Sequence, residues 1–149
     1  MAYWQEFVEA MPELAAYGSK RLLRNVAYLA TIRPDGGPRV HPLVAHIGLG
    51  RLFVYMEPAS PKAHDLQRDV RYALHCSVEN TDGGEGEFSI HGRASLVRDP
   101  ALRTALFESA RADGSNPRDF YLIFELGIES VTSTVYDGDR LIRNRWKAS

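Results

Sequence analysis

The sequence is poor in several features that would point to particular classes of protein. Cys76 is its one cysteine in 149 residues, so no disulfide forms within the chain and a reducing, cytoplasmic setting is expected. No apolar run approaches the roughly 20 residues that a membrane span needs, so no membrane partner is expected. The formal net charge of −1 removes the electrostatic reason to expect a nucleic-acid partner.

Motifs of several common chemistries are also missing. The chain has neither a Walker phosphate loop nor a G-x-S-x-G nucleophile elbow. The glycine-rich run GGEGEF does not open a helix after a strand, so it is no dinucleotide fingerprint. No metal site is expected, because the histidines lack the spacing of metal ligands; they are His41, His46, His64, His75 and His91.

The hydrophobic pattern begins as helical and then becomes strand-like. Residues 1–24 are predicted to form an N-terminal helical segment, with apolar residues three and four positions apart. Pro12 interrupts that pattern, so a kinked helix and two short helices both stay open. Residues 25–57 are typical of a three-stranded meander, in which Asp35-Gly36 makes a hairpin turn. Pro42 cannot donate a ladder hydrogen bond, which predicts an edge or a bulge for its strand.

The remainder of the chain alternates short helices with further strands. Helices are predicted over residues 60–69, with Val70 near their buried face, and from Asp99-Pro100 onward. The run EFSIHGRASLV alternates apolar and polar residues, which is typical of a half-buried strand. We therefore predict a single domain over residues 1–149, mainly β with flanking helices. Its six or seven antiparallel strands would form a barrel or a strongly coiled sheet, because closure removes exposed edges.

The stretch ASPKAHDL contains the clearest local chemistry. Ser60 is a good N-cap, and Pro61 suits the first helical position. The start of a helix exposes unpaired N–H groups and a partial positive charge. With the Ser60 hydroxyl and the Lys62 ammonium added, it could hold a phosphate. Ordinary capping explains the same residues if no anion binds.

The order PRVHPLV, RLFVYM and SPKAHDLQRDVRYAL resembles a known superfamily. It is similar to the flavin-binding split β-barrels that include pyridoxamine 5′-phosphate oxidase, and the resemblance spans roughly residues 22–146. It implies a six-stranded antiparallel split barrel that acts as a homodimer. Flavin mononucleotide (FMN) would lie in clefts at the interface between the two copies.

The resemblance also implies which residues hold the cofactor. Arg39, Ser60 and Lys62 would bind its phosphate, whereas Pro61 stands where the oxidases often have arginine. Further cofactor contacts would come from Val40, His41, Pro42, Met56, Glu57, Glu87, Arg145 and Trp146. Glu87 departs from the usual glutamine, and a carboxylate donates no hydrogen bond to the flavin unless it is protonated. Arg145 and Trp146 would come from the partner subunit, although a core or interface position explains Trp146 equally well.

A flavin-dependent oxidoreductase that transfers a hydride to or from a small organic substrate is therefore expected. His41 and Tyr55 are the candidates for a catalytic acid. The deazaflavin F420 and haem are alternative cofactors, and Lys20, Arg21 and Arg24 could serve the acidic tail of F420. A flavin-binding module without turnover is another alternative. Pyridoxamine phosphate oxidation itself is not expected, because Arg140-Leu141 is followed by Ile142 and Arg143 without the proline of that enzyme.

Overall fold

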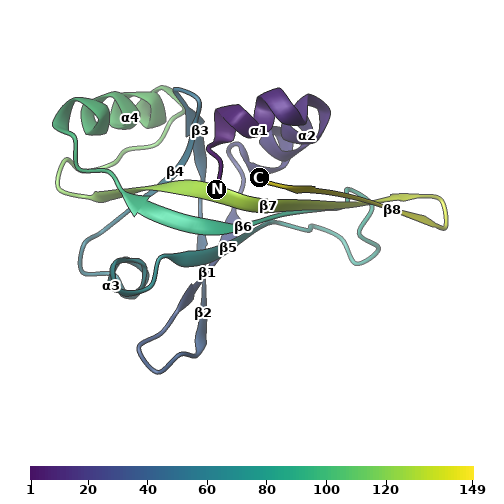
Figure 1. Ribbon diagram of the computed structural model, residues 1–149, viewed down its shortest axis with the longest axis horizontal. Helices are drawn as coiled ribbons and strands as arrows, with labels where there is room; N and C mark the ends of the chain where they lie inside the picture. Colours follow the sequence, from purple (N-terminus) through teal and green to yellow (C-terminus); the bar gives the residue numbers. More distant parts are fainter.

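A computed structural model describes residues 1–149 as four helices around an eight-stranded antiparallel sheet (Figure 1). The helices are α1 (Trp4–Ala10), α2 (Pro12–Leu22), α3 (Pro61–Arg68) and α4 (Pro100–Ala112). The strands are β1 (Ala27–Ile32), β2 (Pro38–Leu43), β3 (His46–Gly48), β4 (Arg51–Met56), β5 (Arg71–Cys76), β6 (Glu87–Leu96), β7 (Leu122–Asp137) and β8 (Arg140–Lys147). The mainly β antiparallel architecture predicted from the sequence is confirmed. There are eight strands because the predicted strand over residues 39–48 divides into β2 and β3.

The order of the strands explains why the sheet curls. It runs β2-β1-β5-β6-β7-β4-β3, and β8 pairs with β7 beside this path. β2 and β3 form the two ends of the path, yet only Val44 and Ala45 separate them in the sequence. A flat sheet cannot place consecutive segments at opposite edges, so the sheet wraps until its edges approach each other. Pro42 lies in an edge strand, as predicted, because β2 pairs with β1 alone.

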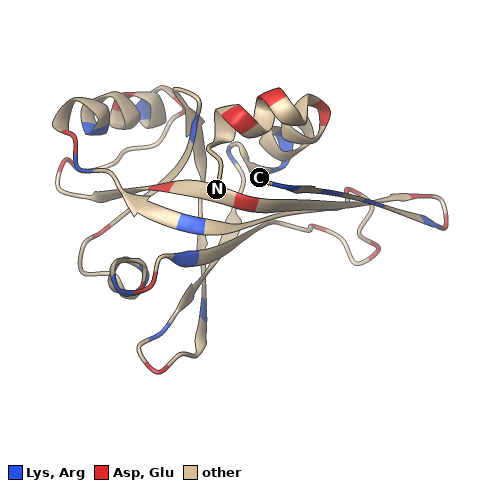
Figure 2. Ribbon diagram, viewed as in Figure 1, with Lys and Arg blue, Asp and Glu red and all other residues tan.

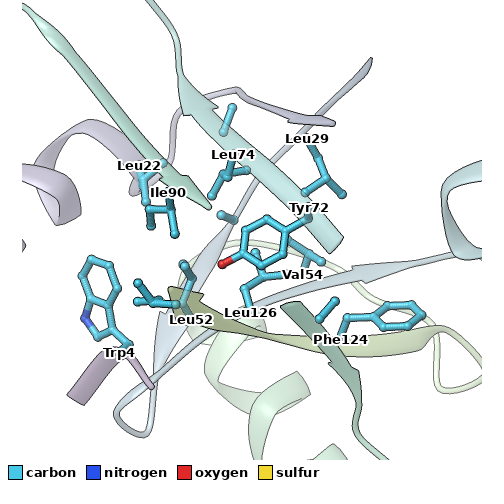
Figure 3. Packing of buried hydrophobic residues seen from close by; sticks show 14 of the residues in the cluster. Trp4, Leu22, Leu29, Leu52, Val54, Tyr72, Leu74, Ile90, Phe124 and Leu126 are labelled. Atoms are coloured by element: carbon cyan, nitrogen blue, oxygen red, sulfur yellow. The ribbon is translucent and has the colours of Figure 1, made fainter. Parts of the chain in front are cut away.

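The core fills the inside of this wrapped sheet (Figure 3). Leu29, Leu74 and Ile90 point into it from β1, β5 and β6, and α1 and α2 add Trp4 and Leu22. A second cluster lies between the sheet and α4; its members are Phe53, Val97, Leu106, Phe107, Ala110 and Ile123. β4 and the first half of β7 are therefore buried on both faces, which is why these stretches are mostly apolar with little alternation.

The helical predictions are confirmed in outline and corrected in detail. Pro12 separates two helices and occupies the first turn of α2, where its missing N–H leaves no bond unmade. α3 ends at Arg68, so Val70 is not on its buried face; its side chain is 37% exposed. The longest helix, α4, has 13 residues, and no helix has the length and apolar character needed to cross a membrane.

β6 shows the alternation that its sequence predicts, with Phe88, Ile90 and Ala94 buried and Arg93 exposed. Its pairing with β7 shifts register between His91 and Gly92. A Cβ atom at Gly92 would lie 1.8 Å from the carbonyl oxygen of Gly127. Glycine is therefore required at this irregularity, where the two backbones approach each other closely.

Arg21 ties the N-terminal helices to the sheet. Its Nη1 donates to the carbonyl oxygens of Glu85 and Gly86 at 2.6 Å and to the Tyr17 hydroxyl at 2.9 Å, while Nη2 donates to the Ser77 carbonyl at 2.5 Å. These bonds occupy most of the guanidinium donors. Of the three cations considered for the tail of F420, Arg21 is thus already committed to the fold.

We expect Arg21→Met to lower the free energy of unfolding by roughly 1.5–3 kcal/mol, the usual worth of one hydrogen bond to a charged group. This loss of stability should exceed the loss from removing an exposed charge, because the carbonyl groups that Arg21 binds lose their donor. Methionine keeps the aliphatic packing of the arginine side chain, so the change reports the hydrogen bonds. Urea denaturation measures it. Lys20→Met is the matched control on the same helix, and equal midpoints for the two variants would contradict the role given to Arg21.

Candidate functional site

The start of α3 has the cap that its sequence predicts. The Ser60 hydroxyl accepts a hydrogen bond from the Ala63 N–H at 3.3 Å, and Pro61 follows in the first turn. The hydroxyl hydrogen remains available to a ligand, because this bond uses only a lone pair of the oxygen. Lys62 is half-buried and forms no ion pair with a carboxylate of the chain.

Asp65, one turn further along α3, gathers donors from three elements. Its Oδ2 accepts from Arg39 Nε in β2 at 2.7 Å and from Thr31 Oγ1 in β1 at 2.8 Å. Its Oδ1 accepts from Arg68 Nη2 at 2.9 Å. We call Thr31, Arg39, Asp65 and Arg68 the Asp65 cluster. The Asp65 side chain is only 1% exposed, so it fixes the Arg39 guanidinium beside α3.

The Asp65 cluster carries a net positive charge. Two guanidinium groups, from Arg39 and Arg68, face one carboxylate, and Figure 2 shows basic and acidic residues meeting at α3. Burial alone would raise the pKa of Asp65, but hydrogen bonds from Arg68, Arg39 and Thr31 outweigh it and lower that pKa below its usual value. Asp65 is therefore ionised at neutral pH.

The lowered pKa of Asp65 predicts a loss of stability in acid. A carboxyl group whose pKa is lower in the folded state stabilises the fold above its unfolded pKa, near 3.9, and loses that contribution as the pH falls through and below this value. We expect the free energy of unfolding, measured in urea between pH 6 and pH 3, to fall more steeply for the wild type than for Asp65→Asn. Parallel profiles would contradict the assignment.

His41 lies on β2 beside the same positive groups. Its pKa is lowered by burial and then by the charges of Lys62 and Arg39, so these cations lie close to the ring. The His41 Nε2 atom is enclosed and has no hydrogen-bond partner within the protein. An enclosed polar atom without a partner is uncommon and is a reason to expect a ligand or an ordered water. Arg39, His41 and Lys62 thus form one group at the start of α3.

The other predicted contacts on β2 and β4 differ in accessibility. Val40 is 62% exposed and shares the outward face of β2 with Pro42. The side chain of Met56 belongs to the core, which leaves only its backbone for a ligand. Glu57 follows β4 directly and is exposed. Val40 and Pro42 lie on β2, the strand that carries Arg39. Met56 and Glu57 lie at the end of β4, shortly before α3 begins.

Glu87, Arg145 and Trp146 do not join this group within one chain. Glu87 lies 3.1 Å from His75 Nε2, and hydrogen bonds to Cys76 and then to Glu87 raise the pKa of His75 to about 9. Trp146 packs against Phe7, with the ring centres 5.2 Å apart, and Arg145 is exposed opposite Thr132. β8 lies well away from α3 (Figure 1). These residues could reach a ligand at α3 only from a second copy.

The two predicted catalytic candidates lie in different surroundings. His41 belongs to the group at the start of α3. Tyr55 belongs to an aromatic stack, with its ring centre 5.2 Å from that of His46 and 5.9 Å from that of Tyr121. No hydrogen bond joins His41 to Tyr55. The stack lies on the α4 side of the sheet, because Tyr55 also contacts Phe107 edge to face.

Comparison with known families places the chain in one of them. A family model described as pyridoxamine 5′-phosphate oxidase matches residues 19–134, which is more than half of the chain. The chain belongs to the pyridoxamine 5′-phosphate oxidase family. The matched residues contain the whole Asp65 cluster, together with His41 and Lys62. A search of curated proteins finds no match.

Several solved structures of other proteins share this fold. A conserved hypothetical protein from Mycobacterium tuberculosis has a TM-score of 0.70 at 20% identity, with 83% of this chain and 82% of that chain covered. A heme binding protein from Mycobacterium smegmatis has a TM-score of 0.64 at 18% identity. The match covers 87% of this chain and 57% of that chain. An F420 reductase has a TM-score of 0.58 at 17% identity, with 76% and 94% covered. At these identities the likeness shows the fold alone.

Proposed function

We propose that this member of the pyridoxamine 5′-phosphate oxidase family is an FMN-dependent oxidoreductase that acts on a small organic substrate. The observation that carries the proposal is the convergence of Arg39, His41 and Lys62 at the start of α3. A phosphate dianion needs several donors, and hydrogen bonds between charged groups are the strong ones. The surplus of positive charge over Asp65 and the unpartnered His41 Nε2 both fit such a ligand.

In this proposal each residue near α3 has a distinct task. Lys62 and the exposed part of the Arg39 guanidinium bind the phosphate, and Ser60 adds its hydroxyl hydrogen. Asp65 does not touch the ligand but holds Arg39 in place. His41 is neutral at pH 7, because its pKa is lowered, so it can form a hydrogen bond or accept a proton but is a poor donor of one. Bound flavin would supply the hydride chemistry itself.

A homodimer follows from the same proposal. Glu87, Arg145 and Trp146 are cofactor contacts in the family resemblance, yet in one chain they lie away from α3. Two copies would complete the site if each gave these residues to the cleft of the other. The family resemblance also supports a dimer. The single cysteine is consistent with a location in the reducing cytoplasm, which is part of the same proposal.

F420 and haem are the alternative cofactors, since two proteins of the same fold are described as an F420 reductase and a heme binding protein. Arg21 donates to backbone carbonyls, so only Lys20 and Arg24 remain to bind the long acidic tail of F420. FMN has no such tail and needs fewer cations, which favours FMN over F420. A flavin-binding module without turnover has the same site and differs only in kinetics.

The visible absorption spectrum of freshly purified protein tests the proposal. We expect the spectrum of bound flavin, or its appearance on addition of FMN, followed by bleaching when a nicotinamide or reduced F420 supplies electrons. A haem or deazaflavin spectrum would select an alternative cofactor. A protein that binds flavin but is never reduced would be a binding module. A colourless protein that takes up none of the three would contradict the proposal.

A further inference from the structure

A concave site apart from the start of α3 lies where β2 passes into β3. It is a cavity of about 240 Å³ between the C-terminal ends of α2 and α4. The residues that matter here are Leu23, Arg24, Val44, His46, Asp113 and Ser115. Arg24 was considered above only for the tail of the alternative cofactor F420, and the other residues are not candidate cofactor contacts, so this cavity needs an explanation of its own.

His46 is the buried polar group of this cavity. The residue is 4% exposed, and its ring stacks on Phe53 and Tyr55 with centre distances of 5.4 and 5.2 Å. No group of the chain hydrogen-bonds to either ring nitrogen, and neither nitrogen is fully enclosed, so the ring edge faces the cavity. Burial lowers the pKa of His46 and Asp113 opposes this only in part, so the ring is neutral at pH 7. Buried polar groups are usually paired, and the ring nitrogens of His46 have no partner within the chain, so a group in the cavity can supply one.

Two opposite charges face the same cavity without pairing. Asp113 caps the C-terminus of α4, and Arg24 follows the end of α2. Neither forms an ion pair with any group of the chain, including the other. The carbonyl end of α4 adds partial negative charge on the Asp113 side. The cavity therefore favours a positive group near Asp113 and a negative group near Arg24.

Apolar surface completes the site. Leu23 is 38% exposed and Val44 is 39% exposed, and both border the cavity. The volume lies below the roughly 300–1,000 Å³ of pockets for drug-sized molecules, so the ligand is small. We propose that this cavity binds a small zwitterion, an α-amino acid with an apolar side chain. Its ammonium lies on Asp113, its carboxylate on Arg24, its side chain on Leu23 and Val44, and His46 hydrogen-bonds to one of its polar ends.

Calorimetric titration with L-leucine tests this proposal. Two analogues, each lacking one charge, are compared with it: L-leucinamide without the carboxylate and N-acetyl-L-leucine without the ammonium. We expect saturable binding of L-leucine and at least tenfold weaker binding of both analogues. No saturation by L-leucine, or an analogue that binds as well as L-leucine, would overturn the proposal.

Variants assign the binding to this cavity. Asp113→Asn and Arg24→Gln should each weaken L-leucine binding at least tenfold, whereas Glu108→Gln, on the exposed side of α4, should leave it unchanged. Circular dichroism checks that each variant is folded. In the wild type, the imidazole nitrogen resonances of His46 should shift as L-leucine saturates the protein. Unchanged affinity in both charge variants, or a static His46 signal, would contradict the site.

The proposal stands apart from the flavin assignment. Lys62→Ala should abolish most flavin binding and leave L-leucine binding intact, because Lys62 does not line this cavity. If the flavin proposal fails, the titration with L-leucine still tests this cavity. If L-leucine does not bind, the flavin proposal is likewise unaffected.

Discussion

The double variant Arg39→Ala/Lys62→Ala should bind FMN at least a hundredfold more weakly than the wild type. A hydrogen bond to a charged group contributes roughly 1.5–3 kcal/mol, so two such losses come to roughly 3–6 kcal/mol. The two residues are neighbours, so their effects need not add, and the lower end of this range is the safer expectation. Quenching of flavin fluorescence on titration measures the affinity.

Controls separate lost phosphate contacts from lost structure. Arg39→Ala also removes a donor from Asp65, so Lys62→Ala alone is the cleaner variant, with an expected loss of about tenfold to a hundredfold. Lys147→Ala removes an exposed lysine of β8 that has no ion pair and should bind FMN like the wild type. If the double variant kept the affinity of Lys147→Ala, the phosphate site would lie elsewhere.

The largest expected loss of stability comes from Asp65→Ala. This change leaves the guanidinium groups of Arg39 and Arg68 and the buried Thr31 hydroxyl without their common acceptor. Removing one partner of a buried ion pair typically costs about 3–5 kcal/mol, and the partial exposure of both arginines favours the lower end. Urea or thermal denaturation measures the change.

Asp69→Ala is the matched control for Asp65→Ala. Asp69 lies one turn later and pairs with Arg71 at the surface, where ion pairs contribute little to stability. We therefore expect a much smaller change in the unfolding midpoint for Asp69→Ala. Equal midpoints for the two variants would show that the Asp65 cluster does not hold β1, β2 and α3 together.

Local chemistry made much of the fold predictable. Ser60 and Pro61 predict the start of α3 from the sequence, because helix capping depends only on the next few residues. The alternation of β6 is equally local, because successive side chains point to opposite faces of a strand. The division into β2 and β3 was not predicted, although Pro42 indicated an irregular edge strand. It depends on how the whole sheet wraps, which no short window of sequence contains.

The candidate site was predictable only in part. Arg39, Ser60 and Lys62 came from a family pattern, and the structure places Arg39 and Lys62 beside His41. Asp65 was missed, because within its own helix it is one polar residue among several. Its partners lie 34 and 26 residues away on β1 and β2, and no spacing reveals such a contact. Arg21 was misread as a free cation for the same reason, since the carbonyls it binds follow β5 and precede β6.

The central claim is that positive groups at the start of α3 bind a phosphate. Parallel titrations of the wild-type protein with FMN and with riboflavin, which lacks only the phosphate, test it most directly. The account predicts that FMN binds at least a hundredfold more tightly, and that Lys62→Ala removes much of this preference. Equal affinities for the two flavins in the wild type would contradict it.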